Sequence, residues 1–568
     1  MNIEKPSSPV IPEWAAILAM TLVAAAIRSV GLGRLGIDHF DEGIYAAAGT
    51  WSLRPSGLAG IDPGLIPYAP PGYPTLVGLA YAILGPSDFA AIAVSILAAV
   101  ATIPVVGLVG RRTFGPGGGA AASVFATVSG LHITFSRMAL TDATLLLTWI
   151  AAIALGGRFL ERPGPGRAVA MGLAVGLAQL VKYNGWLVGA IIAATAVVGI
   201  LVSREDRSRR HLARTFGWGL LAVVVAGLVS WPWFRFVEAH GGYEALLAHQ
   251  RGYLGGISDW PRHLATQLRQ AIALGGLAFP GTIAFGLAFV TVGLSTSGEE
   301  RVREGLRLVL VATVGLVLFA PATSGWWLGL ALVPWMVRDE NPRVRLVATW
   351  WIALTALTPF YHPYARLWLP LEAAGWMMQA SIVLLIVERL RRLGSLASGR
   401  SRFLPAAIVV VLGMATIQSV VPRPAPRPLE GILGPRDSLR VATFRLVADL
   451  PPGVSSVALL GRPSLRFYVA NALASRRVDV RILSNLDELE TLPPDAWAIV
   501  DMAQVRQEGR VVGGQARLPG RWRMVTNEPT TLSPATLLDV DPAAAVGVLS
   551  ARSAPLILLR RSPEATAP

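Results

Sequence analysis

The sequence predicts an all-α polytopic membrane domain of about thirteen spans, followed by a small α/β domain at the C-terminus. The first observation is composition, because the 568 residues are 53% hydrophobic and only 15% charged, whereas soluble domains carry about 25% charged residues. The second is the recurrence of apolar runs of spanning length up to residue 422. The third is a change of pattern near the C-terminus, where apolar runs become strand-sized and alternate with helix-compatible stretches.

The charge pattern is that of a membrane protein. The formal net charge is +15, but the arginines occur in short runs between apolar segments, as expected of cytoplasmic loops. No basic patch is interleaved with aromatic residues, so we expect membrane lipids as partners and no nucleic acid. With 0 cysteines, the chain has no disulfide, thiolate metal site or cysteine nucleophile. The first apolar segment begins near Trp14, lacks an Ala-x-Ala cleavage site before a soluble domain, and is interpreted as a retained anchor.

Apolar runs divide the larger part of the chain into candidate spans. The predicted spans are 13–34, 88–110, 117–135, 141–160, 167–181, 184–203, 215–237, 267–295, 307–321, 325–337, 346–361, 366–388 and 403–422. A further apolar piece, 71–84, has only about fourteen residues, which suits a re-entrant or interfacial helix better than a full crossing.

The basic loops indicate on which side of the membrane each connection lies. If the N-terminus is cytoplasmic and 71–84 does not cross, every strongly basic loop is cytoplasmic, as the positive-inside rule expects. If 71–84 crosses, all of these loops face outward. The rule therefore favours about thirteen spans with the C-terminus outside. The polar clusters then collect on the extracytoplasmic face, and they are 41–42, 137–142, 182–184, 238–262 and 361–366.

Two domains and a linker follow from this topology. Residues 1–422 form the predicted transmembrane domain, which has an extracytoplasmic loop at 35–87, and residues 423–435 form a stiff proline-rich linker. Residues 436–568 form the predicted extracytoplasmic α/β domain. Its expected strands are 456–460, 478–483 and 496–501, and its expected helices are 463–474 and 485–492. The turn at 461–464 lacks the spaced glycines of a phosphate-binding loop, so we interpret this domain as an accessory one.

An adjacent pair of carboxylates, Asp41 and Glu42, follows the first span. Acidic residues often mark a solvated helix end, but ionisable groups beside a membrane core are costly and tend to be functional. Asp41 could act as a general base if it reaches an acceptor hydroxyl. Glu42 could share that work, hold a cation or orient a neighbour.

Cationic residues recur on the extracytoplasmic face, where the positive-inside rule depletes them. Arg137 suits a phosphate through its bidentate fork, while Thr141 or Asp142 could cap the helix that follows. Lys182 suits the same ligand, and snorkelling to the membrane surface is the alternative. Arg366 begins a span and could bind an anionic head group.

Aromatic and histidine residues accompany these cations. Tyr364 suits the aromatic belt of a membrane interface. His240 and His249 lack the spacing of a HExxH metal motif, so no metal site is assigned. Tyr253 or Trp260 could contact a sugar.

A carboxylate pair and three separated cations on one face suit a phosphate-bearing substrate at the membrane surface. A sugar linked to a lipid phosphate meets this requirement. Displacement at its anomeric carbon needs a deprotonated acceptor and a stabilised phosphate leaving group.

Five stretches together resemble the family 39 glycosyltransferases of the GT-C fold, which include the protein O-mannosyltransferases and the lipid A aminoarabinose transferase. They are FDEGIYA at 40–46, APPGYPTL at 69–76, SRMALTDATLL at 136–146, GLAQLVKYNG at 176–185 and YARLWLPLE at 364–372. The resemblance implies a polyprenyl-phosphate-sugar donor and inverting transfer on the extracytoplasmic face.

The resemblance also implies roles for individual residues. Asp41 matches the catalytic acidic position, and Glu42 accompanies it. The positions expected to line the donor phosphate site are matched by Arg137, Asp142, Lys182 and Arg366. Tyr183 and Tyr364 lie beside them in the matching stretches and complete the predicted substrate-binding set.

The sequence departs from the family in three places. Ala69 stands where many bacterial relatives have lysine, and Tyr68 stands where the aminoarabinose branch has an acidic residue, which argues against zinc. A divalent cation is left open and no other cofactor is expected. The β-trefoil domains of the eukaryotic mannosyltransferases are missing, so a protein acceptor is not implied.

The expected protein is an integral glycosyltransferase of a bacterial-type inner membrane that uses an external hydroxyl acceptor. A transporter or flippase of lipid-linked sugars is the alternative, but transporters usually place binding groups near the midplane between repeated halves. An inactive protein that binds lipid-linked glycans is a third hypothesis.

Overall fold

The computed structural model describes residues 13–51, 70–202, 209–274, 324–396 and 433–502, together with 505, 511–512, 515–516, 522–533, 535–537 and 555–562. The chain divides into two compact units. The first, here called the helical unit, comprises Met1–Val30, Ile96–Ser136 and Thr141–Arg423. The second, here called the mixed unit, comprises Gly31–Ser95, Arg137–Leu140 and Pro424–Pro568.

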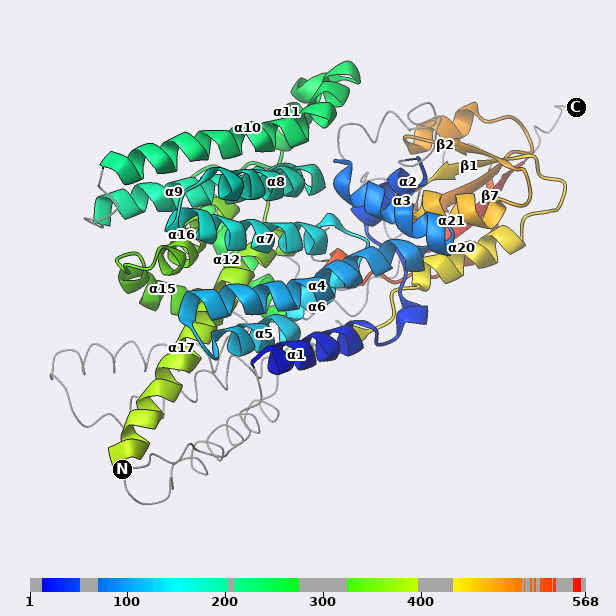
Figure 1. Ribbon diagram of the computed structural model, residues 1–568. Helices are drawn as coiled ribbons and strands as arrows, with labels where there is room; N and C mark the ends of the chain where they lie inside the picture. The colour runs from blue at the N-terminus through cyan, green and yellow to red at the C-terminus, as the bar shows by residue number, and fades with distance from the viewer. Residues whose placement is uncertain are drawn as a thin grey trace, which may run out of the picture. The chain divides into compact units, whose positions relative to one another are not determined.

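The helical unit is built from helices and short turns (Figure 1), and most of its longer helices are apolar. Their bounds are α1 Glu13–Arg28, α4 Asp88–Phe114 (whose first turns belong to the mixed unit), α5 Gly118–Val128, α6 Gly130–Ser136, α7 Thr141–Glu161, α8 Pro165–Val181, α9 Leu187–Val202, α10 Arg209–Ala239, α11 Gly242–Arg251, α12 Trp260–Ala273, α15 Ser324–Met336, α16 Pro342–Leu357 and α17 Leu369–Leu396, with short 3₁₀ turns η4 Tyr183–Trp186, η6 Thr358–Phe360 and η7 Ala365–Trp368.

Close helix packing in this unit depends on small residues. Helix α8 lies against α7 and α10 (Figure 1). A Cβ atom at Gly172 would lie 2.5 Å from the carbonyl oxygen of Ala222, and one at Gly176 would lie 2.7 Å from Val229 Cβ. Glycine at both positions therefore lets the backbones of α8 and α10 approach, as in many membrane helix pairs.

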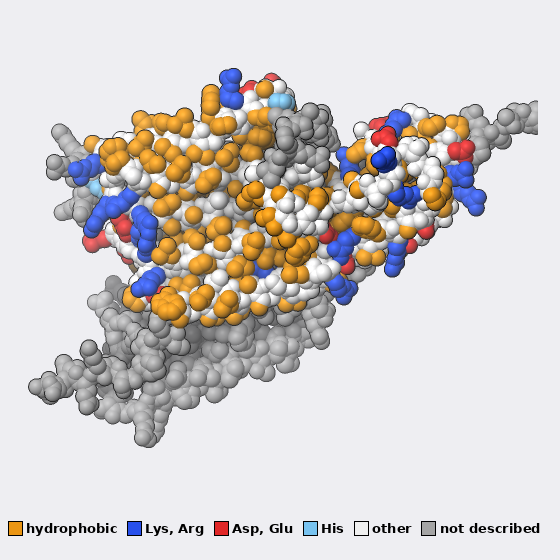
Figure 2. Space-filling view, turned by 45° about the vertical axis from the view of Figure 1, so that its right-hand side comes forward, with side chains coloured by type: hydrophobic (Ala, Val, Ile, Leu, Met, Phe, Trp, Pro, Cys, Tyr) orange, Lys and Arg blue, Asp and Glu red, His pale blue; other side chains and the backbone are white. Residues whose placement is uncertain are grey.

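Four helical stretches of the described residues are long and apolar enough to cross a membrane, and they are Asp88–Phe114, Thr141–Glu161, Tyr183–Val202 and His211–Ala239. Helix α10 exposes Leu220, Val223 and Leu228, each to more than 60%, and hydrophobic side chains cover much of the face in Figure 2. Such surfaces suit lipid rather than water. The chain is an integral membrane protein, as the sequence predicted, while the number of spans stays a prediction. The predicted spans 307–321 and 403–422, and most of 267–295, lie outside the described residues.

One predicted span, 117–135, is two helices instead of one. Helix α5 ends at Val128, Ser129 adopts an extended backbone with ψ 119°, and α6 begins at Gly130. The Ser129 hydroxyl accepts a hydrogen bond from the His132 N–H at 3.3 Å, which caps α6, and donates to Glu372 Oε1 at 3.3 Å. The helix breaks here because the Ser129 side chain caps α6 and is itself held by the carboxylate of Glu372.

The mixed unit combines two helices from the first hundred residues with a sheet from the C-terminal segment. Its elements are η1 Leu32–Arg34, α2 Phe40–Trp51, α3 Gly72–Leu84, α20 Ser438–Ala448, β1 Ser456–Leu460, α21 Pro463–Leu473, β2 Asp479–Ile482, η8 Leu486–Thr491, β3 Trp497–Asp501, β4 Val511–Val512, β5 Gln515–Ala516, β6 Trp522–Glu528 and β7 Leu556–Arg561. Helix α3 coincides with the short apolar piece that was predicted at 71–84.

The five-stranded sheet has the order β2-β1-β3-β7-β6. Strands β2 and β3 flank β1 and run parallel to it, while β7 runs antiparallel to both β3 and β6. The three strands and the helix at 463–474 that the sequence predicted are confirmed by β1, β2, β3 and α21. At 485–492 the structure has a 3₁₀ turn, η8. The antiparallel pair β6 and β7 was not predicted.

Helix α2 packs against both α3 and α21. A Cβ atom at Gly43 of α2 would overlap the backbone of Pro463 and Ser464 at the start of α21. The described parts of the predicted loop 35–87, residues 35–51 and 70–87, belong to the same compact unit as the C-terminal sheet.

Candidate functional site

The acidic pair lies in the first turn of α2, and the sequence around it caps that helix. The N–H of Asp41 donates to His39 Nδ1 at 3.0 Å, and the N–H of His39 donates to Glu42 Oε2 at 3.0 Å. This reciprocal pattern is a capping box in which histidine replaces serine or threonine. It satisfies two amide groups that a helix start leaves without partners.

The two carboxylates of the pair have different environments. Glu42 is 0% exposed, and Asp41 is only partly buried. Successive helical residues point about 100° apart, so one side chain can enter the interior while its neighbour stays near the surface. Of the two carboxylates, Asp41 is therefore the one that solvent reaches.

Glu42 binds both backbone and charge. Its Oε2 accepts from the N–H of Asp38 at 3.1 Å as well as from His39, and its Oε1 accepts from the N–H of Ala139 at 2.7 Å. The guanidinium of Arg436 donates to both oxygens, at 2.5 Å to Oε2 and 3.3 Å to Oε1. Glu42 thus forms an ion pair with Arg436 and accepts from three backbone N–H groups, and its part in catalysis stays a prediction.

Asp38 is a second buried carboxylate of this cluster, 1% exposed, and forms an ion pair with Arg436. It also accepts from the Ser533 N–H at 2.8 Å and from Thr536 Oγ1 at 2.9 Å. Burial alone would raise the pKa of Asp38, but the charge of Arg436 and the hydrogen bonds from Ser533 outweigh burial and lower the pKa below its usual value. Asp38 is therefore ionised at neutral pH.

Arg436 is the cation that both carboxylates share. It is 7% exposed, and its NH1 also donates to the carbonyl oxygen of Arg137 at 2.8 Å. Burial would lower its pKa, but Asp38 and Glu42 together raise the pKa above its usual value. We call Asp38, Glu42 and Arg436 the buried charge cluster.

Arg137 lies in the short connection 137–140, whose backbone is held by side chains from three other segments. Glu42 accepts from the Ala139 N–H, Arg436 donates to the Arg137 carbonyl, and Ser95 Oγ donates to the Leu140 carbonyl at 3.1 Å. The cluster thus fixes the connection next to the start of α2.

The guanidinium of Arg137 is buried, and its NH2 donates to the carbonyl oxygen of Leu433 at 3.3 Å. Burial, and then the nearby charge of Arg436, lower the pKa of Arg137 to about 10, which leaves it protonated at neutral pH. Its role in binding phosphate stays a prediction.

Two other predicted site residues pair within the helical unit. Lys182 Nζ lies 2.7 Å from Asp142 Oδ1, and Asp142 is 4% exposed. Tyr183 accepts a hydrogen bond at its hydroxyl from Trp233 Nε1 at 3.0 Å, and its ring makes an edge contact with Tyr243. The lysine is therefore held by a buried counterion at the start of η4.

The predicted stretch 364–372, at η7 and the start of α17, forms an aromatic group with the loop after α11. Arg366 lies over the ring of Tyr364, with its Cζ 5.1 Å from the ring centroid. The ring centroid of Tyr253 lies 6.1 Å from that of Tyr364, and a β-bridge joins Leu254 to Tyr361. The structure brings the predicted Arg366 and Tyr364 together, and adds Tyr253 to them.

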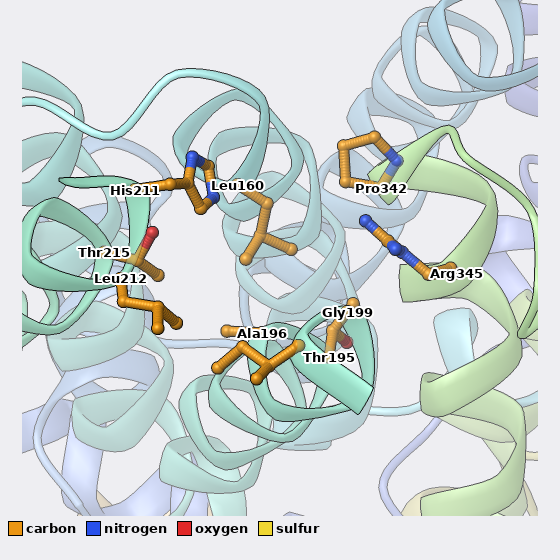
Figure 3. Close-up of a pocket in the computed structure, with 10 residues that line it drawn as sticks. Leu160, Thr195, Ala196, Gly199, His211, Leu212, Thr215, Pro342 and Arg345 are labelled. Carbon is orange, nitrogen blue, oxygen red and sulfur yellow. The ribbon is translucent and has the colours of Figure 1, made fainter. Parts of the chain in front are cut away.

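A small, open pocket also occurs in the helical unit. Figure 3 shows Arg345 entering it from α16 and His211 from α10, beside Leu160 of α7. Among the ten described residues that line it, none is Asp or Glu. It therefore offers no carboxylate base, and none of the predicted site residues lines it.

Sequence reasoning missed Asp38 and Arg436. Asp38 follows the apolar residues Leu35 and Ile37 and precedes Phe40. An acidic residue directly after an apolar stretch was an available sign of burial. Arg436 carries no comparable signal, because it is one of several arginines around a proline-rich segment.

Comparison with known proteins gives the class of the chain. Residues 68–233 match the family model of dolichyl-phosphate-mannose-protein mannosyltransferases. No curated protein sequence matches the chain.

Three solved structures have a similar fold. ArnT from Cupriavidus metallidurans bound to undecaprenyl phosphate matches with a TM-score of 0.52 and 15% identity over 97% of this chain and 99% of that chain. ArnT in the apo state matches with a TM-score of 0.52 and 15% identity over 96% of this chain and 97% of that one. The Archaeoglobus fulgidus oligosaccharyltransferase in complex with zinc and sulfate matches with a TM-score of 0.52 and 14% identity over 90% of this chain and 71% of that one.

The chain is thus a membrane protein with the GT-C fold of these glycosyltransferases. Its segment 68–233 is similar to the dolichyl-phosphate-mannose-protein mannosyltransferase family. These matches confirm the resemblance that the sequence motifs predicted. The acidic pair at 41–42 lies outside the segment that the family model matches.

Proposed function

We propose that this chain is an inverting glycosyltransferase that moves a sugar from a polyprenyl-phosphate-linked donor to a hydroxyl acceptor on the extracytoplasmic face of a bacterial-type inner membrane. The match to a mannosyltransferase family supports a sugar donor on a lipid phosphate. The similarity to ArnT bound to undecaprenyl phosphate supports a polyprenyl carrier.

One observation carries the proposal. The capping box and the buried charge cluster hold Asp41 in the first turn of α2, where it is partly exposed while Glu42 is enclosed. A carboxylate held in this way can accept a proton without a change of fold. Asp41 is therefore the proposed base.

The reaction follows from these roles. The acceptor O–H gives its proton to the Asp41 carboxylate as the acceptor oxygen forms a bond to the anomeric carbon. The bond from that carbon to the phosphate oxygen breaks, and its electron pair leaves with the lipid phosphate. Attack from the face opposite the leaving group inverts the anomeric configuration. No protein-bound sugar intermediate is needed.

The developing charge on the phosphate requires cations or hydrogen-bond donors. We assign this role to Arg137, Lys182 and Arg366. Asp142 holds Lys182 at 2.7 Å, and the ring of Tyr364 lies under Arg366. Tyr183 adds a phenolic hydroxyl beside Lys182.

The test is transfer by the purified full-length chain reconstituted in liposomes, with polyprenyl-phosphate sugars as donors and soluble and lipid hydroxyl compounds as acceptors. We expect Asp41→Asn to lower kcat by about 100-fold or more, since general base catalysis contributes about 10²–10⁴. The matched control is Asp479→Asn, which changes an exposed aspartate of β2. Transfer by Asp41→Asn at the native rate would remove Asp41 from the mechanism. Movement of the donor lipid across the bilayer without any transfer product would favour a transporter.

A further inference from the structure

We propose that Arg436 is a positioning residue for the transfer reaction, so that the C-terminal segment is part of the catalytic apparatus and not an accessory domain. This inference rests on the proposed function, because it concerns the residue that places Asp41. It also departs from the expectation drawn from sequence, in which the C-terminal domain carried no chemistry.

Arg436 joins three segments through one planar group. Its NH1 donates to Glu42 and to the carbonyl oxygen of Arg137, and its NH2 donates to Asp38 and to Glu42. Its own N–H donates to the carbonyl oxygen of Arg34 at 2.8 Å. A guanidinium has the fixed fork of donors that this arrangement needs, whereas an ammonium is a point charge.

The charges explain why α2 depends on this residue. Asp38 precedes Asp41 by three positions and Glu42 follows it directly. Both flanking carboxylates are almost completely buried, and Arg436 is the cation with which both form ion pairs. Without Arg436, two buried negative charges would lose their shared counterion, which strongly destabilises a buried cluster. The turn that carries Asp41 would then have to open, or a buried carboxylate would have to take up a proton.

The sheet supports the same turn from a second direction. Strand β1 lies between β2 and β3, and the carboxyl ends of β1 and β3 form the edge at which open α/β sheets usually bind ligands. Arg462, which follows β1, forms an ion pair with Asp501 at the end of β3 at 2.8 Å. The NH1 of Arg462 also donates to the carbonyl oxygen of Asp38 at 3.1 Å. Arg462 at this edge of the sheet thus binds the residue just before α2.

Three further residues of the mixed unit secure this arrangement. Tyr468 of α21 accepts a hydrogen bond from the Ile37 N–H at 2.6 Å and donates to Asp88 at 3.0 Å. Arg440 of α20 forms an ion pair with Asp88 at 2.8 Å. The C-terminal segment contacts residues 37–42 through Arg436, Arg462, Tyr468, Ser533 and Thr536, and Ala139 adds a hydrogen bond to Glu42 from the connection 137–140.

The experiment compares Arg436→Met with the native full-length chain in the reconstituted transfer assay. We expect kcat to fall by about 100-fold, the loss expected when a general base is misplaced, while KM for the donor changes by less than about threefold. A double-mutant cycle with Glu42→Gln tests whether the loss of Arg436 acts through Glu42. If Arg436 acts through Glu42, the double variant is no slower than the slower single variant.

The matched control is Arg445→Met, which removes an exposed arginine of α20 that pairs with Glu528 at 3.3 Å. Its transfer rate should stay at the native value. Arg436→Lys keeps the positive charge but lacks the planar set of donors of the guanidinium. It is the variant to measure if Arg436→Met does not fold. We expect Arg436→Lys to fold with a lowered kcat and a native KM.

Three outcomes decide between the two proposals. Native kcat in Arg436→Met or in Arg436→Lys overturns the positioning role. Independent effects of Arg436→Met and Glu42→Gln, whose fold-changes multiply, also overturn it. No transfer by the native chain with any donor instead overturns the proposed function, on which the inference rests.

Discussion

Replacing Glu42 by glutamine is the most direct perturbation of the buried charge cluster. The change preserves the shape of the side chain and removes its charge. Oε2 accepts from the N–H groups of Asp38 and His39 and from Arg436, while Oε1 accepts from the Ala139 N–H and from Arg436. A glutamine amide has only one oxygen. In either orientation its NH₂ group therefore faces donors that the carboxylate satisfied.

The cost follows from these contacts. Removing one partner of a buried ion pair costs about 3–5 kcal/mol, because the other charge stays buried. Each lost hydrogen bond to a charged acceptor contributes about 1.5–3 kcal/mol, and this loss overlaps with the first. We therefore expect the local opening of α2 to become about 3–5 kcal/mol easier, which corresponds to an opening constant roughly 100- to 4,000-fold larger.

Amide hydrogen exchange measures this opening. The exchange of the native and Glu42→Gln chains is compared by mass spectrometry of peptides from residues 38–51. The exchange rates of the α2 amides should rise by that factor, up to the limit set by global unfolding. Glu528→Gln is the control, because its exposed pair with Arg445 should contribute less than about 1 kcal/mol. A change of less than about threefold in Glu42→Gln would refute the assignment of Glu42 to a buried, charge-bearing network.

Two other variants test separate parts of the structure. Lys182→Met leaves the buried carboxylate of Asp142 without its partner at 2.7 Å, so thermal unfolding in detergent should begin at a lower temperature. Adding Asp142→Asn should restore part of the lost stability, and additive effects of the two changes would contradict the pairing. Gly43→Ala places a methyl group on the backbone of Ser464 and should destabilise the mixed unit by at least about 1–3 kcal/mol, seen as faster limited proteolysis near α2. Gly33→Ala, where a Cβ meets nothing within 4 Å, should not change the cleavage rate.

Local sequence patterns predicted the elements whose formation depends on local properties. Strands β1 and β3 are short apolar runs between turn residues, and α3 is an apolar run that begins directly after Pro70 and Pro71. Long apolar stretches such as α4 and α7 were placed from their length alone. The break at Ser129 was missed because it depends on Glu372, a contact between residues 243 positions apart.

The candidate site was predictable only in part, for a related reason. Asp41 and Glu42 were identified as a pair, because two charges next to an apolar segment are conspicuous in sequence. The different environments of the two carboxylates depend on Arg436, which lies 394 positions after Glu42. Periodicity and composition report on neighbours along the chain, so they contain no information about this pairing. The C-terminal segment was consequently interpreted as separate from the chemistry.

The long separation of Glu42 from Arg436 has a consequence for biogenesis. At a synthesis rate of about 5–20 residues per second, the 394 residues between them take roughly 20–80 s to emerge. During that interval Asp38 and Glu42 exist without the cation that later pairs with both, so the start of α2 lacks the contacts that hold it in its buried state. Maturation of the acidic turn therefore waits for Arg436 and for the later residues that bind Asp38, and a chain that stops before residue 436 leaves the ribosome with its proposed base unplaced.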